Sequence, residues 1–257
     1  RAVAGVGMAD GQVPVCSAPA GSAGGGGGDS IKGCDSGVQE VGLALITVRS
    51  EGEEVVMALV LVGESARMGP GPGHLTGMTA SGTGSYDFSG IEVAADAIVG
   101  QPGDYLRQPE FSAGAWRASA VALGAMDRLV DLLRKELRAR GRAGNPHQQV
   151  RIGRALILRE TAFMWVKRAA FATCEPEAES GEIAAIVNLA RLAVEEAALE
   201  LVTLVQRGLG VAALVRGRAV EQVMRDLATY LRQPAPDETM TEAAAWFTQH
   251  EWPEDRA

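Results

Sequence analysis

The residues best able to bind a metal ion or act as nucleophiles are few in this chain and lie far apart. The three histidines and three cysteines are His74, His147, His250, Cys16, Cys34 and Cys174. No two cysteines form a Cys-x-x-Cys pair, and no histidine lies three or four residues from another ligand of its kind. The spacing therefore predicts neither a metal site nor a disulfide framework, and it favours a reducing, cytoplasmic compartment.

A glycine-rich segment near the start of the chain has the composition of a phosphate-binding loop but lacks its other parts. Residues 24–28 are an unbroken glycine run. A P-loop ends in Lys-Ser or Lys-Thr and leads directly into a helix, and neither feature follows here. Because glycine loses the most backbone entropy on ordering, we expect this segment to be a mobile loop.

The charge balance argues against a nucleic-acid partner. The chain has 24 basic and 32 acidic residues and a formal net charge of −8, so it repels phosphate backbones unless basic residues cluster. They gather only in short runs, at residues 134–135 and 138–142. No uninterrupted apolar stretch reaches about 18 residues, so no membrane-spanning helix is expected. The start of the chain also lacks the layout of a signal peptide.

Residues 1–106 are expected to form a glycine-rich antiparallel β domain. Valine-rich apolar runs at 41–48 and 55–62, joined by a short polar turn, predict a β-hairpin. Residues 75–80 predict a further strand. The apolar side chains at 86, 88, 91 and 93 nearly alternate, which predicts another strand with a bulge at Gly90.

Residues 107–257 are expected to form an up-down four-helix bundle, which makes the fold class α+β. The helical spacing of apolar residues predicts helices at about 116–137, 148–172, 183–204 and 219–231. The third is apolar on most faces, so it should be buried centrally or at a subunit interface. Pro234 and Pro236 are expected to end the fourth.

Several short motifs resemble, in their order along the chain, those of the acyl-CoA dehydrogenase family. HLTGMTASGTGSYDFSGIEVAADAIVGQPG at 74–103 resembles the end of that family's middle β domain. Lys32 with Ser36-Gly37 resembles its G-x-K-x-x-x-S-G strand. RGRAGNP at 140–146 is similar to its R-x-x-F-G-x-P turn, QRGLG at 206–210 to its Q-x-x-G-G turn, and Arg225-Asp226 to the R-D of its last bundle helix.

The resemblance, which covers residues 30–233, implies a flavoprotein that holds FAD between the β domain and the bundle. It places the Ser36 hydroxyl beside the flavin ring, Arg140 on the pyrophosphate of a neighbouring subunit, and Gln206 and Gly210 near the adenine-side phosphates. A guanidinium suits phosphate because it offers several fixed donors. It further implies an acyl-CoA or similar small-molecule substrate and a homo-oligomer, either a dimer or a tetramer.

Each implied contact also has a purely structural interpretation. Ser36 would then be a strand-end hydroxyl with a local partner, and Arg140 a helix-terminal arginine that interacts with the helix dipole. Gln206 would be a plain helix-end residue. Arg225 and Asp226 are expected to form an ion pair inside the bundle rather than to contact the cofactor.

The chain departs from the family pattern in several places. The family's phenylalanine in the arginine turn is Ala143, a later glutamine falls at Arg151, and Leu209 splits the second glycine pair. The N-terminal helical domain of the family is also expected to be missing. The chain is thus expected to be a fragment, a partial gene product or a reduced homologue.

The most consequential departure concerns the catalytic base. The family's usual glutamate lies nine residues after the arginine of R-D, where this chain has Pro234. Proline cannot remove the α-proton of an acyl thioester. Asp237 and Glu238 follow closely, and Glu110 is the one carboxylate near the start of the first bundle helix, so the catalytic residue stays unassigned.

Three functions follow from these observations. The first is an FAD-dependent oxidoreductase of the acyl-CoA dehydrogenase type that acts on an acyl thioester. The second is a flavin monooxygenase on the same fold, which needs no α-proton base. The third is a non-catalytic helical oligomer.

Overall fold

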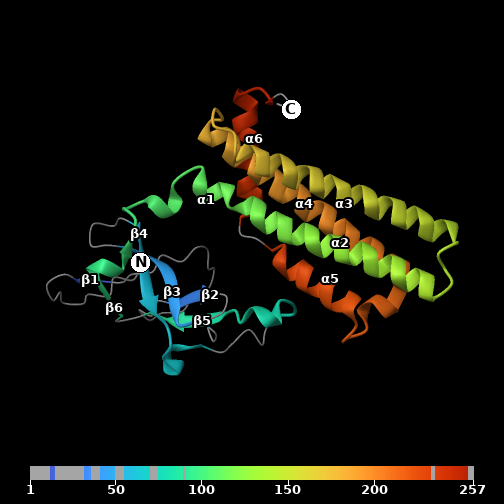
Figure 1. Ribbon diagram of the computed structural model, residues 1–257, viewed down its shortest axis with the longest axis horizontal. Helices are drawn as coiled ribbons and strands as arrows, with labels where there is room; N and C mark the ends of the chain where they lie inside the picture. The colour runs from blue at the N-terminus through green and yellow to red at the C-terminus, as the bar shows by residue number, and fades with distance from the viewer. Residues whose placement is uncertain are drawn as a thin grey trace. The chain divides into compact units, whose positions relative to one another are not determined.

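The computed structural model describes residues 12–14, 32–35, 41–49, 55–69, 75–88, 91–232 and 235–253. The chain divides into two compact units (Figure 1). The first, a β unit, comprises Arg1–Leu75 and Thr79–Arg107. The second, a helical unit, comprises Gln108–Ala257 together with the short segment Thr76–Met78.

In the described part of the β unit, seven short strands form three antiparallel sheets. The strands are β1 (Gln12–Pro14), β2 (Lys32–Asp35), β3 (Leu43–Arg49), β4 (Val55–Leu61), β5 (Gly84–Asp87), β6 (Glu92–Ala94) and β7 (Ile98–Val99). β1 pairs with β6, β2 with β5, and β4 lies between β3 and β7. The helical unit and these sheets confirm the α+β class.

The predicted hairpin is confirmed as β3 and β4, which pair from Leu43 with Leu61 to Arg49 with Val55. Alternate side chains of both strands are buried, and they pack with Tyr86 and Phe88 in one cluster. Tyr86 and Phe88 have ring centroids 4.9 Å apart. The alternation seen in the sequence thus places one face of the hairpin in the core of the β unit.

Two strand predictions in this region were wrong. Residues 75–80 form no strand, because Met78 has a φ of 57° and Thr79–Ser81 is a 3-10 turn. Of the alternating residues, Tyr86 lies in β5 and Val93 in β6, which are in different sheets, and Phe88 and Ile91 lie outside both strands. The bulge predicted at Gly90 lies outside the described residues.

Six α-helices form the described part of the helical unit. They are α1 (Glu110–Ala113), α2 (Ala115–Ala139), α3 (Pro146–Ala172), α4 (Ser180–Leu209), α5 (Ala219–Tyr230) and α6 (Pro236–Gln249). Figure 1 shows α2, α3 and α4 side by side, with α5 next to α2. The four predicted bundle helices correspond to α2 to α5. Asn145 caps α3 by accepting a hydrogen bond from the Gln148 N–H, and Pro146 occupies its first turn.

α4 is the central helix, as its apolar faces predicted. It packs against α2, α3 and α6, and 14 of its 30 residues are buried. The segment Ser180–Leu214 is long and apolar enough to cross a membrane by length and composition alone, although no such helix was expected. Half of its most apolar window is buried inside the protein, which is the pattern of a core helix.

α6 was missed by the sequence interpretation, which treated Pro234 and Pro236 only as helix-ending residues. Pro236 occupies the first turn of α6, where a missing N–H costs nothing. α6 packs on α4, with Trp246 lying directly over Gly181. Pro234 itself lies outside the described residues.

Candidate functional site

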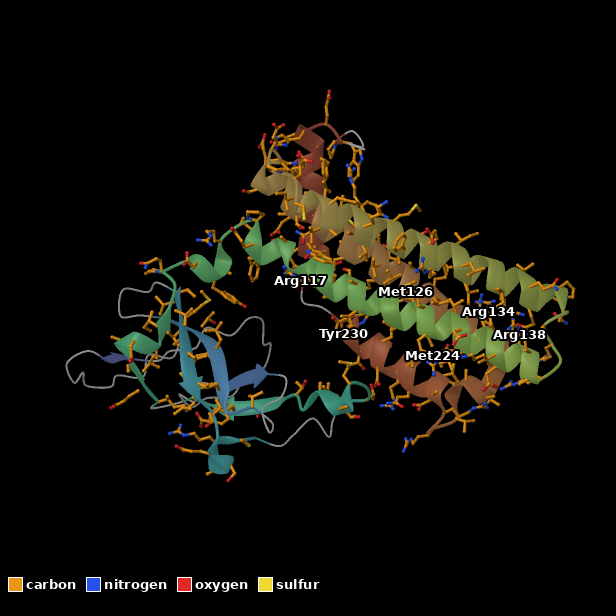
Figure 2. All side chains as sticks on the ribbon, viewed as in Figure 1. Arg117, Met126, Arg134, Arg138, Met224 and Tyr230 are labelled. Carbon is orange, nitrogen blue, oxygen red and sulfur yellow. The ribbon has the colours of Figure 1, made fainter. Side chains whose placement is uncertain are left out.

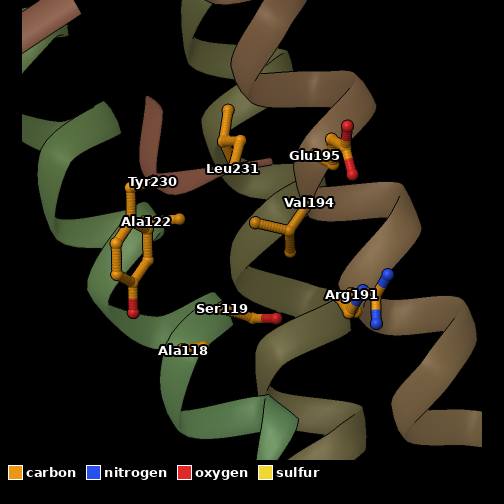
Figure 3. A pocket seen from close by; sticks show the side chains of 8 residues that line it. All are labelled: Ala118, Ser119, Ala122, Arg191, Val194, Glu195, Tyr230 and Leu231. Atoms are coloured by element: carbon orange, nitrogen blue, oxygen red, sulfur yellow. The ribbon is translucent and has the colours of Figure 1, made fainter. Parts of the chain in front are cut away.

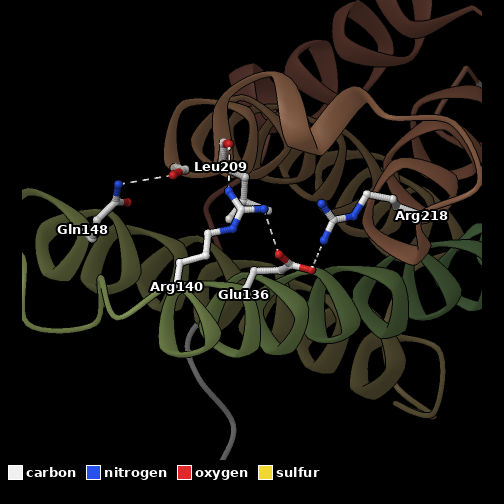
Figure 4. Close-up of polar contacts among 6 residues, drawn as sticks. Glu136, Arg140, Gln148, Leu209 and Arg218 are labelled. Atoms are coloured by element: carbon white, nitrogen blue, oxygen red, sulfur yellow. Dashed lines mark hydrogen bonds and ion pairs between the residues drawn. The ribbon is translucent and has the colours of Figure 1, made fainter.

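One end of the helical bundle holds a network of charged groups (Figure 4). Arg140 follows the last residue of α2, and its Nη2 lies 2.8 Å from Oε2 of Glu136. Its Nη1 donates a 3.2 Å hydrogen bond to the carbonyl oxygen of Leu209, at the end of α4. Arg218, just before α5, reaches the other Glu136 oxygen at 2.5 Å. One carboxylate thus joins two guanidinium groups where three helices meet.

Gln148 lies at the same end of the bundle, in the first turn of α3. Its side chain is only 5% exposed, and its Nε2 donates a 3.2 Å hydrogen bond to the carbonyl oxygen of Gly208. Its Oε1 is buried and has no hydrogen-bond partner. A buried acceptor without a donor is costly, so this oxygen suits a ligand that brings an N–H or O–H group.

A hollow of about 210 Å³ adjoins Gln148 in the groove between α2 and α3. Its lining residues are Arg134, Leu137, Arg138, Ala143, Gln148, Gln149 and Ile152. Figure 2 shows Arg134 and Arg138 together near the end of α2, far from Arg117 at its start. The hollow therefore combines apolar side chains with two guanidinium groups, and Gln148 lies at its edge with its buried oxygen toward Gly208.

A second, much smaller hollow lies between α2, α4 and the end of α5 (Figure 3). It is lined by Ala118, Ser119, Ala122, Arg191, Val194, Glu195, Tyr230 and Leu231, and its volume of about 20 Å³ suits roughly one water molecule. Burial raises the pKa of Tyr230, so its hydroxyl stays protonated at neutral pH. Burial lowers the pKa of Arg191, against the opposing effect of Glu195.

Arg225 and Asp226 hold the segment Thr76–Met78 against α5. Asp226 Oδ1 accepts a 2.8 Å hydrogen bond from the Met78 N–H, and Arg225 Nη1 donates a 2.6 Å bond to the Thr76 carbonyl. The two side chains also lie 3.7 Å apart as an ion pair. A Cβ on Gly77 would lie only 2.3 Å from the Arg225 carbonyl oxygen, so the close approach requires glycine. The expected ion pair is present, and its second role is to anchor this segment.

Among the residues with described positions, no group of three potential metal ligands lies close enough together to hold an ion. Cys174 is exposed and is not in a disulfide.

No protein-family model matches the sequence, and neither does any curated protein. Solved structures do match. The dibenzothiophene monooxygenase TdsC from Paenibacillus sp. A11-2 is 20% identical, with a TM-score of 0.72 over 95% of this chain and 69% of that one. The flavoprotein nitroalkane oxidase is 14% identical, with a TM-score of 0.70 over 86% and 59%. Butyryl-CoA dehydrogenase from Megasphaera elsdenii is 13% identical, with a TM-score of 0.71 over 86% and 60%.

The chain has the acyl-CoA dehydrogenase fold. It spans about three fifths of the nitroalkane oxidase and butyryl-CoA dehydrogenase chains. TdsC has been solved with FMN, and with FMN and indole together. At these identities the match establishes the fold alone.

Within the acyl-CoA dehydrogenase fold, Arg140, Gln206 and Gly210 lie at the same end of the bundle. Arg140 lies beside the end of α4, where Gly210 caps the helix with a φ of 65° and donates its N–H to the Gln206 carbonyl. The Gln206 side chain is exposed. Ser36 lies outside the described residues. The contacts of these residues with FAD stay predictions.

The sequence interpretation missed Gln148. Its neighbours in the turn match the acyl-CoA dehydrogenase motif, but Gln148 itself does not, and it looks like an ordinary polar residue of a first helical turn. Its burial arises because α3 packs against Gly208 of α4. A Cβ on Gly208 would approach the Gln148 oxygen to 3.4 Å and a methyl group of Leu133 to 2.9 Å. Gly208, a glycine inside the last turn of the third predicted helix, is the one sequence signal that could have pointed to Gln148.

The Glu136 network should make the stability of the bundle depend on pH. Burial alone raises the pKa of Glu136, but the hydrogen bonds from Arg140 and Arg218 outweigh it, so the pKa is lower than usual. Stability from such a group is present above the unfolded pKa, near about 4.3, and is lost as the pH falls through the folded pKa. Because Glu136, Arg140 and Arg218 are partly exposed, we expect Glu136→Gln to lower the free energy of unfolding by only about 1 kcal/mol at pH 7.

This prediction is measured by urea unfolding of both proteins from pH 7 down to pH 3. The difference in the free energy of unfolding should shrink toward zero at the acid end. Asp131→Asn is the matched control, because Asp131 pairs with Arg128 and Lys135 at the exposed surface of the same helix. A Glu136→Gln difference that stays constant with pH would contradict the prediction.

Proposed function

We propose that this chain belongs to a flavin-dependent oxidoreductase and that the bundle end around Arg140 and Gln148 holds the adenosine diphosphate half of FAD. The unsatisfied, buried Oε1 of Gln148 beside a cluster of arginines carries the proposal. The similarity to three flavin-enzyme structures of the same fold supports it. Bound flavin would supply hydride acceptance or, once reduced, reaction with oxygen.

The residues present suit a dinucleotide better than FMN. Guanidinium groups at Arg134, Arg138 and Arg140 match phosphate oxygens. The apolar floor of the larger hollow, with Ala143 where the family has phenylalanine, has room for a flat ring. The amino group of adenine is a donor that could reach the Gln148 oxygen, and FMN has no equivalent group. We therefore propose FAD as the cofactor, although TdsC has been solved with FMN.

Titration of the purified chain with FAD, FMN and riboflavin tests this proposal. We expect FAD to bind at least about tenfold more tightly than FMN, which corresponds to about 1.4 kcal/mol. Gln148→Met should remove most of that preference, because methionine fills the space but cannot accept the bond. Gln222→Met, at an exposed position of α5 outside this hollow, is the matched control. Absence of flavin binding would overturn the proposal, and equal affinity for FAD and FMN would overturn its adenine part.

Two reactions are candidates. Dehydrogenation of an acyl thioester follows from the resemblance, but it requires a carboxylate base, and the usual position holds Pro234. That proline is the observation that favours the second candidate, monooxygenation of a small-molecule substrate. Asp237 and Glu238 lie in the exposed first turn of α6.

Anaerobic reduction of the flavin-loaded protein separates these reactions. Bleaching of the flavin by an acyl-CoA would support dehydrogenation. Reduction only by a separate flavin reductase, followed by oxygen consumption with substrate, would support monooxygenation. We also propose that the chain works as a homo-oligomer.

A further inference from the structure

The short turn that follows α4 exposes apolar side chains at the end of the bundle. This turn, η5 (Gly210–Leu214), is a 3-10 helix, in which side chains three residues apart lie on the same side. Val211 and Leu214 have that spacing and are 81% and 60% exposed, whereas Ala213 is fully buried. Val215 continues the exposed side at 48%. We call Val211, Leu214 and Val215 the η5 tip.

The end of the bundle that carries the η5 tip is strongly basic. Arg140 and Arg218 both bind Glu136, so the turn between α2 and α3 meets the segment after α4 here (Figure 4). Residues 134–151 and 206–218 contain nine of the 24 basic residues of the chain and only one of its 32 acidic residues. That acidic residue is Glu136, which two guanidinium groups already share. This end is therefore positive, although the whole chain has a net charge of −8.

Three arginines of this end point to a partner other than the flavin. Arg142, Arg207 and Arg216 are exposed and form no ion pair within the part of the chain that the structure describes. None of the three is among the residues proposed to hold FAD. Arg207 lies in the last turn of α4, and Arg216 directly follows the η5 tip. Aliphatic side chains flanked by guanidinium groups have the composition of surfaces that bind anionic lipid.

The chemistry of the η5 tip favours a lipid surface over other anionic partners. The tip has no aromatic ring that could stack on a nucleic-acid base. An acidic protein would need a pocket shaped for three protruding side chains, whereas the boundary between headgroups and acyl chains accepts them without such a match. Because most of the remaining surface charge is negative, an anionic bilayer would attract this end and repel the others.

We propose that the η5 tip, with Arg142, Arg207 and Arg216, docks the protein reversibly on an anionic lipid bilayer. The aliphatic side chains enter the boundary between headgroups and acyl chains, and the guanidinium groups bind lipid phosphates. The contact is peripheral, because three short side chains bury far less apolar area than a membrane-spanning helix. The inference goes beyond the proposed flavin chemistry and does not depend on it.

Co-sedimentation with lipid vesicles tests the proposal. The full chain without flavin is mixed with vesicles of phosphatidylcholine, either alone or with an equal part of phosphatidylglycerol. We expect at least about tenfold stronger binding to the anionic vesicles. Raising the salt from about 0.1 M to about 1 M should weaken it, because the screening length falls from about 10 Å to about 3 Å. No binding to the anionic vesicles, or equal binding to both kinds, would overturn the proposal.

Leu214→Glu tests the apolar part of the surface. It should weaken binding to the anionic vesicles at least about tenfold, because it removes an inserted leucine and adds a negative charge. Val121→Glu is the matched control, since Val121 is also 60% exposed but lies on α2. We expect the control to change binding by less than about twofold, with unchanged helical circular dichroism in both variants. Equal losses in the two variants would overturn the assignment to the η5 tip.

Arg142→Gln/Arg216→Gln tests the charged part. Each arginine at an anionic surface strengthens binding about fivefold, so the double variant should bind about 25-fold more weakly. Arg117→Gln/Lys167→Gln removes the same charge from exposed positions elsewhere on the helical unit. We expect this control to weaken binding by less than about threefold. Equal losses would mean that net charge alone governs binding, which contradicts a defined docking surface.

An environment-sensitive fluorophore tests insertion. Cys16, Cys34 and Cys174 are replaced by serine, and the label is attached at Val211→Cys or, as a control, at Val121→Cys. Anionic vesicles should shift the emission to the blue at position 211 and leave it unchanged at position 121. An unchanged spectrum at 211 while the protein sediments would show that another surface binds. A response to soluble polyglutamate but not to vesicles would indicate an acidic protein partner and overturn the lipid assignment.

Discussion

Replacing Arg140 with alanine should weaken FAD binding by about 10- to 100-fold while the bundle stays folded. Hydrogen bonds to charged groups contribute about 1.5–3 kcal/mol, and each 1.4 kcal/mol is a factor of ten in the dissociation constant. Two donors of this guanidinium are engaged by Glu136 and the Leu209 carbonyl. Those two contacts fix the orientation of the guanidinium, and its remaining N–H groups are the ones that the proposal assigns to a phosphate.

Arg218→Ala is the control that separates a cofactor contact from a structural role. Arg218 shares Glu136 with Arg140 but was not implied as a flavin contact. We expect it to change the FAD dissociation constant by less than about threefold and to lower stability by an amount similar to Arg140→Ala. Equal losses of FAD affinity in both variants, measured by fluorescence titration, would mean that Arg140 only supports the network.

Gly77→Val should release the segment Thr76–Met78 from α5 and lower the free energy of unfolding of the helical unit by about 3 kcal/mol. The new Cβ would fall 2.3 Å from the Arg225 carbonyl oxygen and 2.4 Å from Thr229 Oγ1. The helix backbone cannot yield, so the segment must move. Its two charge-assisted hydrogen bonds, each of about 1.5–3 kcal/mol, are then lost in part to water.

Urea unfolding followed by the helical circular dichroism signal measures this effect. Gly63→Val is the matched control, because nothing lies within 4 Å of a Cβ built at Gly63. We expect the control to change the free energy of unfolding by less than about 0.5 kcal/mol. Similar values for the two variants would show that the collision at Gly77 is relieved at little cost.

The repeating patterns of the sequence were enough to predict most elements of the fold. The alternation in β3 and β4 and the three-to-four spacing in α2 to α5 directly reflect which side is buried. The third predicted helix is apolar on most of its faces, and this placed α4 at the centre of the bundle. α6 could not be predicted this way, because its most visible signal, Pro236, marks the start of one helix as readily as the end of another.

The candidate site was harder to predict because it depends on contacts between distant residues. Arg140 lies in a turn that resembles a family motif, so the sequence indicated it. Its contacts with Glu136 and the Leu209 carbonyl could not be predicted, because they form only when α2 packs beside α4. The burial of Gln148 likewise depends on its packing against Gly208. Arg225 and Asp226 suggested a local ion pair, and nothing in the sequence indicated that they also bind a segment some 150 residues away.

The alanines on the inner face of α3 have a consequence for how firmly that helix is held. Of its six buried residues, four are alanines, whereas α4 buries fourteen residues that include leucine, isoleucine and valine. Hydrophobic stabilisation grows with the apolar area removed from water, so each of these alanines contributes less than a buried leucine of α4. Ile152, Leu158 and Trp165 add only partly buried area to the same core. α3 should therefore open locally at a lower free energy than α4, and amide hydrogen exchange would measure the difference.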